Sequence, residues 1–148
     1  MTAILTIANQ KGGVGKTTTA INLAAALAQR KKKTLLVDLD PQSNSSIAFF
    51  ETKDVQVSMF DVLSDHHAEL SSIIQQTKDP LLSVAPAKLA LAKLEQQLAG
   101  QFDAPFKLKD ALSPVARDYD FIVIDTPPSL GILTVNALVA ATHLLVPI

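Results

Sequence analysis

A short glycine-rich loop near the start of the chain combines lysine and hydroxyl side chains at a spacing suited to binding phosphate. The loop reads Lys11-Gly12-Gly13-Val14-Gly15-Lys16-Thr17-Thr18. Glycines let backbone N–H groups converge on an anion, and the N-terminus of a following helix adds partial positive charge. In such a loop Lys16 can reach the β and γ phosphates, and the Thr17 hydroxyl can ligate Mg²⁺. The sequence therefore predicts a site for a nucleoside triphosphate with Mg²⁺.

The segments on either side of the loop are those that a phosphate-binding loop requires. Residues 3–8 form an apolar run, which predicts a buried strand. After the loop, apolar residues recur at the spacing of one helix face, at Ala20, Leu23, Ala24, Leu27 and Ala28. Strand, loop and amphipathic helix thus occur in the order that the chemistry needs, which argues against a glycine-lysine turn without a ligand.

Three aspartates stand at the ends of apolar runs that predict buried strands. Residues 34–39 contain Asp38 and lead to Asp40, and residues 121–125 end in Asp125. The carboxyl ends of parallel strands meet at one edge of a sheet, where sites in α/β folds lie. A carboxylate beside Mg²⁺ stays ionised and can orient a water in line with a γ phosphate. The alternative is local: Asp38 and Asp40 could cap the next helix, and Asp125 could simply end its strand.

The rest of the chain alternates between expected strands and helices. Further strands are expected at residues 81–86 and 143–148. Helices are expected at residues 43–50, 58–63, 69–76, 91–100, 108–115 and 131–141. This pattern predicts an α/β fold with a doubly wound, mainly parallel sheet and helices on both faces. We expect residues 1–148 to belong to a single domain.

Length and composition limit the possible classes of protein. A chain of 148 residues with 48% hydrophobic residues can build one domain around a core. No apolar run approaches the roughly 20 residues of a membrane span and no signal segment is evident, so a cytoplasmic protein is expected. Cysteine is absent, which excludes disulfides and thiolate-bound zinc or iron–sulfur centres within the chain. The net charge of −1 provides no overall attraction to DNA or anionic lipid.

Other groups that could bind ligands have simpler interpretations. The basic run at residues 30–33 follows the first helix, which predicts a solvated loop where one of the three lysines takes a positive φ. His66 and His67 are adjacent and cannot share a helix face as metal ligands, so we expect them to be solvated. Four phenylalanines are expected in the core rather than as platforms for nucleic acid, namely Phe49, Phe50, Phe102 and Phe106.

The glycine-rich loop departs from the usual pattern G-x-x-x-x-G-K-[ST] at its first position. Gln10 stands where the pattern has glycine, and Lys11 follows it. The resulting K-G-G-x-G-K-[ST] form resembles the deviant Walker A loop of the ParA/MinD superfamily of dimerising ATPases. The resemblance implies a P-loop NTPase fold, ATP as the nucleotide, and a Lys11 that touches the nucleotide bound to the partner subunit.

A second segment resembles the switch I segment of the ParA family, which includes Soj-like proteins. Residues 38–44 read D-L-D-P-Q-S-N and match the family pattern D-x-D-P-Q-x-N. The resemblance implies that Asp40 positions or activates the attacking water. It also implies that Asp38 supports the magnesium environment.

Two more segments complete the resemblance in the expected order. Residues 121–125 have the Walker B form, which implies that Asp125 holds Mg²⁺ through water. Residues 126–131 read T-P-P-S-L-G and resemble switch II, in which the Pro-Pro segment, here including Pro128, and a backbone amide near Gly131 sense the γ phosphate. The match is strongest at residues 3–44 and 118–148 and weak in between.

The resemblance as a whole implies an Mg²⁺-dependent ATPase for chromosome or plasmid partitioning. ATP binding would join two subunits, the dimer would bind DNA without sequence preference, and a ParB-like partner would stimulate hydrolysis; no membrane is expected. The implied catalytic residues are Lys11, Lys16 and Asp40. The implied nucleotide-binding residues are Lys11, Gly12, Gly13, Val14, Gly15, Lys16, Thr17, Thr18, Pro128 and Gly131, and the implied metal residues are Thr17, Asp38, Asp40 and Asp125.

The same resemblance suggests that the chain is the N-terminal part of a longer domain. An apolar strand is expected up to Ile148, and ParA-like ATPases usually continue for on the order of a hundred residues. The contacts to DNA and to the adenine base are expected in that later region. The domain therefore looks truncated after residue 148.

Two alternative functions remain at this point. One is a MinD-like ATPase that positions division machinery on a membrane through a C-terminal amphipathic helix. The other is a nucleotide-binding remnant without turnover. An iron–sulfur protein of the nitrogenase type is set aside because the chain has no cysteine.

Overall fold

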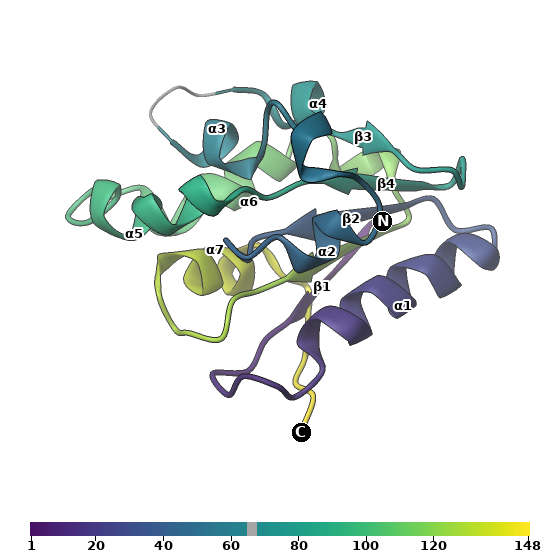
Figure 1. Cartoon of the computed structure of the whole chain (residues 1–148), viewed down its shortest axis with the longest axis horizontal. Helices are drawn as coiled ribbons and strands as arrows, with labels where there is room; N and C mark the ends of the chain where they lie inside the picture. Colours follow the sequence, from purple (N-terminus) through teal and green to yellow (C-terminus); the bar gives the residue numbers. More distant parts are fainter. Residues whose placement is uncertain (65–67) are drawn as a thin grey trace.

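A mixed β-sheet forms the centre of the computed structural model, which describes residues 1–64 and 68–148 (Figure 1). Its strands are β1 (Ala3–Ile7), β2 (Thr34–Asp38), β3 (Gln75–Gln76), β4 (Leu82–Ala85), β5 (Phe121–Asp125) and β6 (His143–Leu145). They lie in the order β3-β4-β2-β5-β1-β6. All neighbouring strands are parallel except β3, which pairs antiparallel with β4. This confirms the predicted mainly parallel sheet.

Helices cover both faces of the sheet, as predicted (Figure 1). The α-helices are α1 (Lys16–Gln29), α2 (Asn44–Ile47), α3 (Met59–Leu63), α4 (Leu70–Ile73), α5 (Leu94–Gln97), α6 (Lys107–Leu112) and α7 (Ile132–Ala140). Short 3₁₀ helices are η1 (Thr52–Asp54), η2 (Leu89–Lys93), η3 (Ala104–Phe106) and η4 (Ala116–Asp118). On one face, α1 packs on Leu36 and Val123; on the other, α3 to α7 pack on Leu35 and Ile122. Alternate residues of β2 and β5 thus feed two separate cores.

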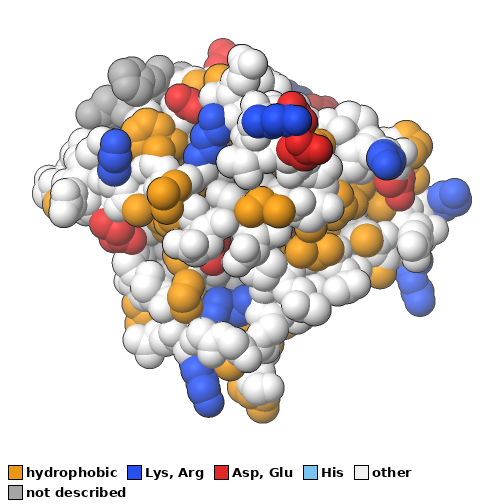
Figure 2. Space-filling view, in the orientation of Figure 1, with side chains coloured by type: hydrophobic (Ala, Val, Ile, Leu, Met, Phe, Trp, Pro, Cys, Tyr) orange, Lys and Arg blue, Asp and Glu red, His pale blue; other side chains and the backbone are white. Residues whose placement is uncertain are grey.

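Helix α1 shows the predicted apolar stripe. Ala20, Ala24 and Ala28 are buried against the sheet. The helix is followed by Lys31 with φ of 66°, which confirms the expected positive φ among the three lysines. The whole basic run at residues 30–33 is exposed, and Figure 2 shows Lys and Arg side chains at the edge of the molecule where α1 ends. The loop is solvated, as predicted.

The middle of the chain differs from the sequence prediction. The helix expected at residues 69–76 ends at Ile73 and gives way to β3, because Gln75 and Gln76 pair with Val84 and Ser83 of β4. The helices expected at residues 43–50 and 91–100 shrink to α2 and to η2 followed by α5. Elements of one turn have little internal stability, so tertiary contacts decide their extent. Within the described residues, no helix is long and apolar enough to cross a membrane.

The expectation of four core phenylalanines holds for only two of them. Phe49 and Phe50 are partly buried against the core under α1. Phe102 is 98% exposed and Phe106 is 47% exposed, so the prediction for these two was wrong. In that segment Ala104 and Leu108 occupy the core instead. His66 and His67 lie outside the described residues.

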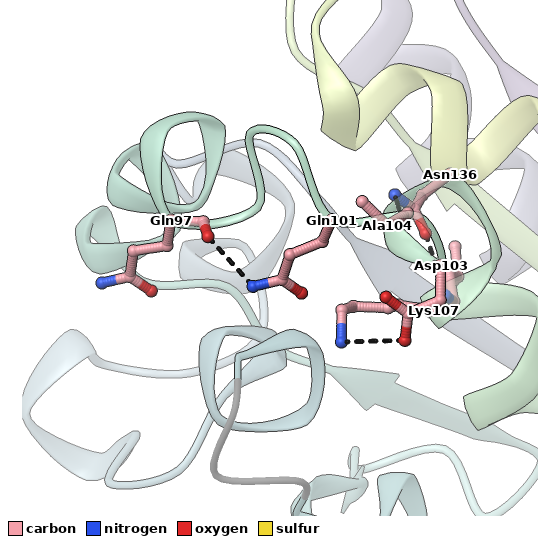
Figure 3. Close-up of polar contacts among 7 residues, drawn as sticks. Gln97, Gln101, Asp103, Ala104, Lys107 and Asn136 are labelled. Carbon is pink, nitrogen blue, oxygen red and sulfur yellow. Dashed lines mark hydrogen bonds and ion pairs between the residues drawn. The ribbon is translucent and has the colours of Figure 1, made fainter.

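A buried asparagine ties α7 to the chain segment that crosses it. The Asn136 side chain is 1% exposed; its Oδ1 accepts from Leu108 N at 3.0 Å and its Nδ2 donates to Ala104 O at 2.9 Å. Nδ2 also donates to Ile132 O within α7, at 2.9 Å. Figure 3 shows Asn136 directed at Ala104, beside the ion pair of Asp103 with Lys107 at 3.7 Å. The asparagine therefore supplies the buried backbone groups of η3 and α6 with partners.

Replacing Asn136 by leucine should destabilise the fold. Leucine has the same branching as asparagine but cannot hydrogen-bond, so it leaves the buried N–H of Leu108 and C=O of Ala104 without the Asn136 side chain as partner. Such groups cost about 1–3 kcal/mol each, so we expect the free energy of unfolding to fall by about 2–4 kcal/mol. Urea unfolding measures this change. The matched control is Asn22→Leu, because Asn22 makes the same kind of bond to Thr18 O on exposed α1 and should change stability by under about 0.5 kcal/mol; equal effects of the two variants would contradict the prediction.

Candidate nucleotide-binding site

The sheet register brings the predicted site segments to one edge. Residue Ile7 at the end of β1 pairs with Asp125 of β5, and Asp38 of β2 pairs with the same Asp125. The glycine-rich loop leaves β1 at this edge and opens α1. Because all three strands are parallel and end together, residues more than a hundred positions apart face one region.

A cavity of about 350 Å³ lies beside this edge. It is lined by Gly12, Gly13, Gly15, Lys16, Thr17, Thr18, Asp40, Gln42, Asn44 and Pro128. The loop, switch I and switch II thus contribute to one surface. A larger cavity of about 470 Å³ lies elsewhere, between α4 and α6. The smaller cavity has the glycine-rich loop and the helix N-terminus that bind phosphate, so its chemistry makes it the candidate site.

Two glycines of the loop hold backbone conformations that favour glycine. Gly13 has φ of 71° and Gly15 has φ of 87°. In this left-handed region a Cβ is strained, so the loop requires glycine at both positions. At Gly12 there is room for a Cβ, which would lie at an ordinary contact distance of 3.9 Å from Pro128 Cβ. Switch II therefore packs directly on the phosphate loop.

The two lysines of the loop are placed very differently. Lys16, the first residue of α1, is 7% exposed, and its Nζ donates to Lys11 O at 2.9 Å. Its ammonium group therefore lies along the inside of the loop. Lys11 is exposed, and its side chain is not among the cavity-lining residues. Of these two lysines, Lys16 is the one placed to meet a phosphate in this cavity.

The Thr17 side chain, which lines the cavity, contacts the buried Asp125 side chain, which does not line it. Thr17 Oγ1 donates to Asp125 Oδ2 at 2.9 Å, and Ser45 Oγ donates to the same oxygen. Burial raises the pKa of the Asp125 carboxyl, while the hydrogen bonds from Ser45 and Thr17 lower it. Ser45 is a residue of this site that sequence reasoning missed, since its position after switch I carries no motif.

The other oxygen of Asp125 indicates room for a cation. In the part of the chain that the structure describes, Oδ1 is buried and has no hydrogen-bond partner. A buried carboxylate oxygen without a partner is costly and is satisfied by water or a cation. Mg²⁺ typically uses one or two carboxylates together with substrate phosphates and waters. Thr17 and Asp125 therefore fit a magnesium ion that accompanies a nucleotide.

Asp38 lies behind switch I rather than on the cavity. It is fully buried; Oδ1 accepts from Asp40 N at 3.0 Å, and Oδ2 accepts from Ser46 N at 2.9 Å and from Ser46 Oγ at 2.6 Å. Burial raises the pKa of Asp38 to about 7, the Asp125 charge adds to the rise, and the Ser46 hydrogen bonds oppose it. Both oxygens thus hold the backbone of switch I, and Asp38 does not line the cavity.

Asp40 combines the two interpretations that the sequence left open. Its Oδ1 accepts from Gln42 N at 3.0 Å, which is a local turn, and the residue also lines the cavity with 8% exposure. The carboxylate can therefore hold the shape of switch I and present its second oxygen to the site. Gly131, in contrast, does not line the cavity and lies at the start of α7.

The chain matches a known domain family over nearly its whole length. The family model described as AAA domain matches residues 2–148. The chain belongs to this family. The phosphate loop and both switch segments fall inside the matched region.

Two curated relatives share 46% of their aligned residues with the chain. They are the chromosome partitioning protein ParA of Myxococcus xanthus, aligned over 146 residues, and the sporulation initiation inhibitor protein Soj of Bacillus subtilis, aligned over 149. The alignments cover 98% and 100% of this chain but 51% and 58% of the relatives. The resemblance to ParA and Soj proteins is confirmed, and the chain spans little more than half the length of these relatives.

Solved structures of the same fold contain nucleotide. A cobyrinic acid a,c-diamide synthase from Mycobacterium smegmatis, with bound ATP analogue and magnesium, superposes with a TM-score of 0.95 at 39% identity, over 100% of this chain and 60% of that one. A plasmid partition protein from Borrelia burgdorferi bound to AMPPNP gives a TM-score of 0.88 at 32% identity, over 99% and 61%. The P-loop NTPase fold is confirmed, and related proteins bind ATP analogues and magnesium.

Proposed function

We propose that the chain is the nucleotide-binding part of an ATPase that dimerises with ATP and acts in chromosome or plasmid partitioning. One observation carries the proposal: Lys16, Thr17 and Asp40 line one cavity at the carboxyl edge of the sheet, and Thr17 donates a hydrogen bond to the buried Asp125 beside it. These are the groups that phosphoryl transfer to water requires, namely a phosphate contact, a magnesium position and a carboxylate for the nucleophile.

Each residue has a distinct task in the proposed hydrolysis. The loop amides and Lys16 bind the phosphates and offset their charge. Thr17 and Asp125 would hold Mg²⁺, which supplies further positive charge to the β and γ phosphates. Asp40 accepts a hydrogen bond from the attacking water and orients it toward the γ phosphate. Asp38 keeps Asp40 in place through the Asp40 amide at 3.0 Å.

The names and similarity of the relatives favour partitioning as the process. The ParA and Soj relatives are 46% identical to the chain, against 39% for the synthase of the same fold. We propose that the full protein acts in the cytoplasm on the nucleoid, binds DNA without sequence preference through residues beyond this chain, and is stimulated by a ParB-like protein. The net charge of −1 agrees with a DNA surface located elsewhere.

The exposed Lys11 supports a dimer as the active form. Its side chain is exposed and does not line the cavity of its own subunit, and its backbone O accepts a hydrogen bond from Lys16 Nζ. A cation that does not contact the phosphate site of its own subunit is available to contact the phosphate site of a second subunit. The ATP-bound homodimer is proposed on that basis.

The experiment that tests the function compares the wild type with Lys16→Ala. The wild type should bind a fluorescent ATP analogue with Mg²⁺ and release phosphate. Lys16→Ala should bind about 10- to 150-fold more weakly, because it loses a charge-assisted contact of about 1.5–3 kcal/mol. Lys32→Ala is the matched control, since Lys32 is exposed on the far end of α1 and should bind as the wild type does.

Two results would contradict the proposal. Affinity of Lys16→Ala within threefold of the wild type would reject the phosphate loop. Tight binding by the full-length wild type without any phosphate release, in the presence of DNA and Mg²⁺, would show a nucleotide-binding remnant instead of an ATPase.

A further inference from the structure

Switch II ends in a contact that the ParA resemblance did not indicate. Glu95 of α5 reaches the start of α7, where its Oε2 accepts from Ile132 N at 3.0 Å. Glu95 lies in the part of the chain where the family resemblance is weak. The carboxylate thus binds the first amide of α7, directly after the last residue of switch II.

Gly131 provides the space for this contact. A Cβ added to Gly131 would lie 2.1 Å from Glu95 Oε1, so any side chain there would displace the carboxylate. The Gly131 backbone has φ of −72° and ψ of −172°, which other residues adopt freely. Glycine is therefore needed at this position for the close approach of Glu95 and not for its backbone conformation.

The segment that carries Glu95 is itself anchored. Leu94 and Leu98 on either side of it are buried in the core. Figure 3 shows the next link, where Gln101 Nε2 donates to Gln97 O at 3.1 Å. Further along, Ala104 O binds the Asn136 side chain of α7. Segment and helix are thus joined at two successive turns of α7, at Ile132 through the exposed Glu95 and at the buried Asn136.

The first residue of switch II, Thr126, is also held in place. Thr126 is buried, and its Oγ1 donates to Ile7 O at 2.8 Å in the adjoining strand. Between the two ends, Pro128, Ser129 and Leu130 are exposed, and Pro128 lines the cavity. Within this stretch, Ser129 O accepts from Thr134 Oγ1 at 2.7 Å, again on α7. The position of Pro128 therefore depends on where α7 begins.

We propose that Glu95 is a positioning residue for catalysis, which sets switch II against the phosphate site by holding Ile132 N across Gly131. This proposal rests on the proposed ATPase function. Glu95 does not line the cavity, so we expect its loss to leave the phosphate contacts of Lys16 intact. Loss of Glu95 lets the start of α7 and switch II take other positions, which lowers the fraction of molecules in the conformation that hydrolyses ATP.

The test uses Glu95→Ala, Gly131→Ala and the double variant in the full-length protein. The hydrogen bond from Ile132 N to Glu95 contributes a factor of about 2 to 10, so each single variant should release phosphate about 2- to 10-fold more slowly at saturating ATP. Affinity for the fluorescent ATP analogue should stay within about twofold, because the phosphate loop is untouched. The double variant should be no slower than either single one, since both changes remove the same contact.

Three further measurements separate positioning from a general loss of structure. Glu95→Gln keeps an acceptor oxygen and should retain most of the rate, whereas Gln96→Ala, at the exposed neighbouring position, should match the wild type. Amide hydrogen exchange at Ile132 should speed up in Glu95→Ala and Gly131→Ala. The urea midpoint of these variants should stay close to that of the wild type.

Different outcomes reject different statements. If the wild type releases phosphate and Glu95→Ala does so equally fast, the positioning role is wrong and the ATPase function stands. Slowing in the double variant equal to the product of the two single effects would also overturn the role, because the two residues would act independently. If the wild type itself releases no phosphate, the proposed function fails and the catalytic role of Glu95 fails with it.

Discussion

Replacing Lys11 by alanine should leave a protein that binds ATP as a monomer but neither dimerises nor turns over. Lys11 is exposed and does not line the cavity of its own subunit. If its ammonium group contacts the phosphates of the neighbouring subunit, it resembles an arginine finger acting in trans. Loss of such a group lowers the rate by roughly 10³- to 10⁵-fold. The backbone contact of Lys11 O with Lys16 Nζ survives the substitution, so nucleotide affinity should hold.

Light scattering and phosphate release on the full-length protein, with ATP, Mg²⁺ and DNA, measure the effect of Lys11→Ala. Lys32→Ala serves as the control, because it removes the same charge from an exposed position away from the loop. The control should dimerise and hydrolyse as the wild type does. Normal dimerisation and turnover in Lys11→Ala would reject the trans-acting lysine and remove a main argument for an ATP-dependent dimer.

Asp40→Ala should bind ATP and Mg²⁺ normally while hydrolysis falls by about 10²- to 10⁴-fold, the usual contribution of a group that handles the proton of a nucleophile. ATP should then trap a stable dimer, since the bound nucleotide is not consumed. The structure adds a complication, because Asp40 Oδ1 also accepts from Gln42 N at 3.0 Å. The alanine variant therefore loses a turn contact as well as a carboxylate.

Asp40→Asn separates these two losses. Asparagine retains an oxygen that can accept from Gln42 N but cannot carry the negative charge that orients water. We expect both variants to be inactive and both to form the trapped dimer in chromatography with ATP. Undiminished phosphate release from Asp40→Asn would show that Asp40 shapes switch I and that another group orients the water.

The sequence by itself determined the fold class and the principal members of the candidate site. The strand, glycine loop and amphipathic helix around Lys16 are local features, and their order specifies a P-loop. The positions of Asp40 and Asp125 follow from one more rule, that parallel strands end at a common edge. The register of Asp38 with Asp125 shows this edge directly. Local spacing was informative here because each motif lies within one element and its adjoining loop.

The tertiary structure alone decided which side chains from different elements meet. Ser45 is hydrogen-bonded to Asp125, and Glu95 to the backbone N of Ile132. The residues of each pair are far apart in the chain, so no spacing pattern in the sequence predicts these contacts. The position of Asp38 behind switch I is likewise known only from its hydrogen bonds with Asp40 N and Ser46 Oγ.

The same dependence on contacts between different elements explains the wrong predictions in the middle of the chain. Phe102 is exposed because the core beside α7 is filled by Ala104 and Leu108, which Asn136 holds in place. Strand β3 exists because it pairs antiparallel with β4, the next strand along the chain, and this pairing outweighs the weak preference of a short run for helix. Short elements take their conformation from the neighbours they pack against, and a linear pattern does not name those neighbours.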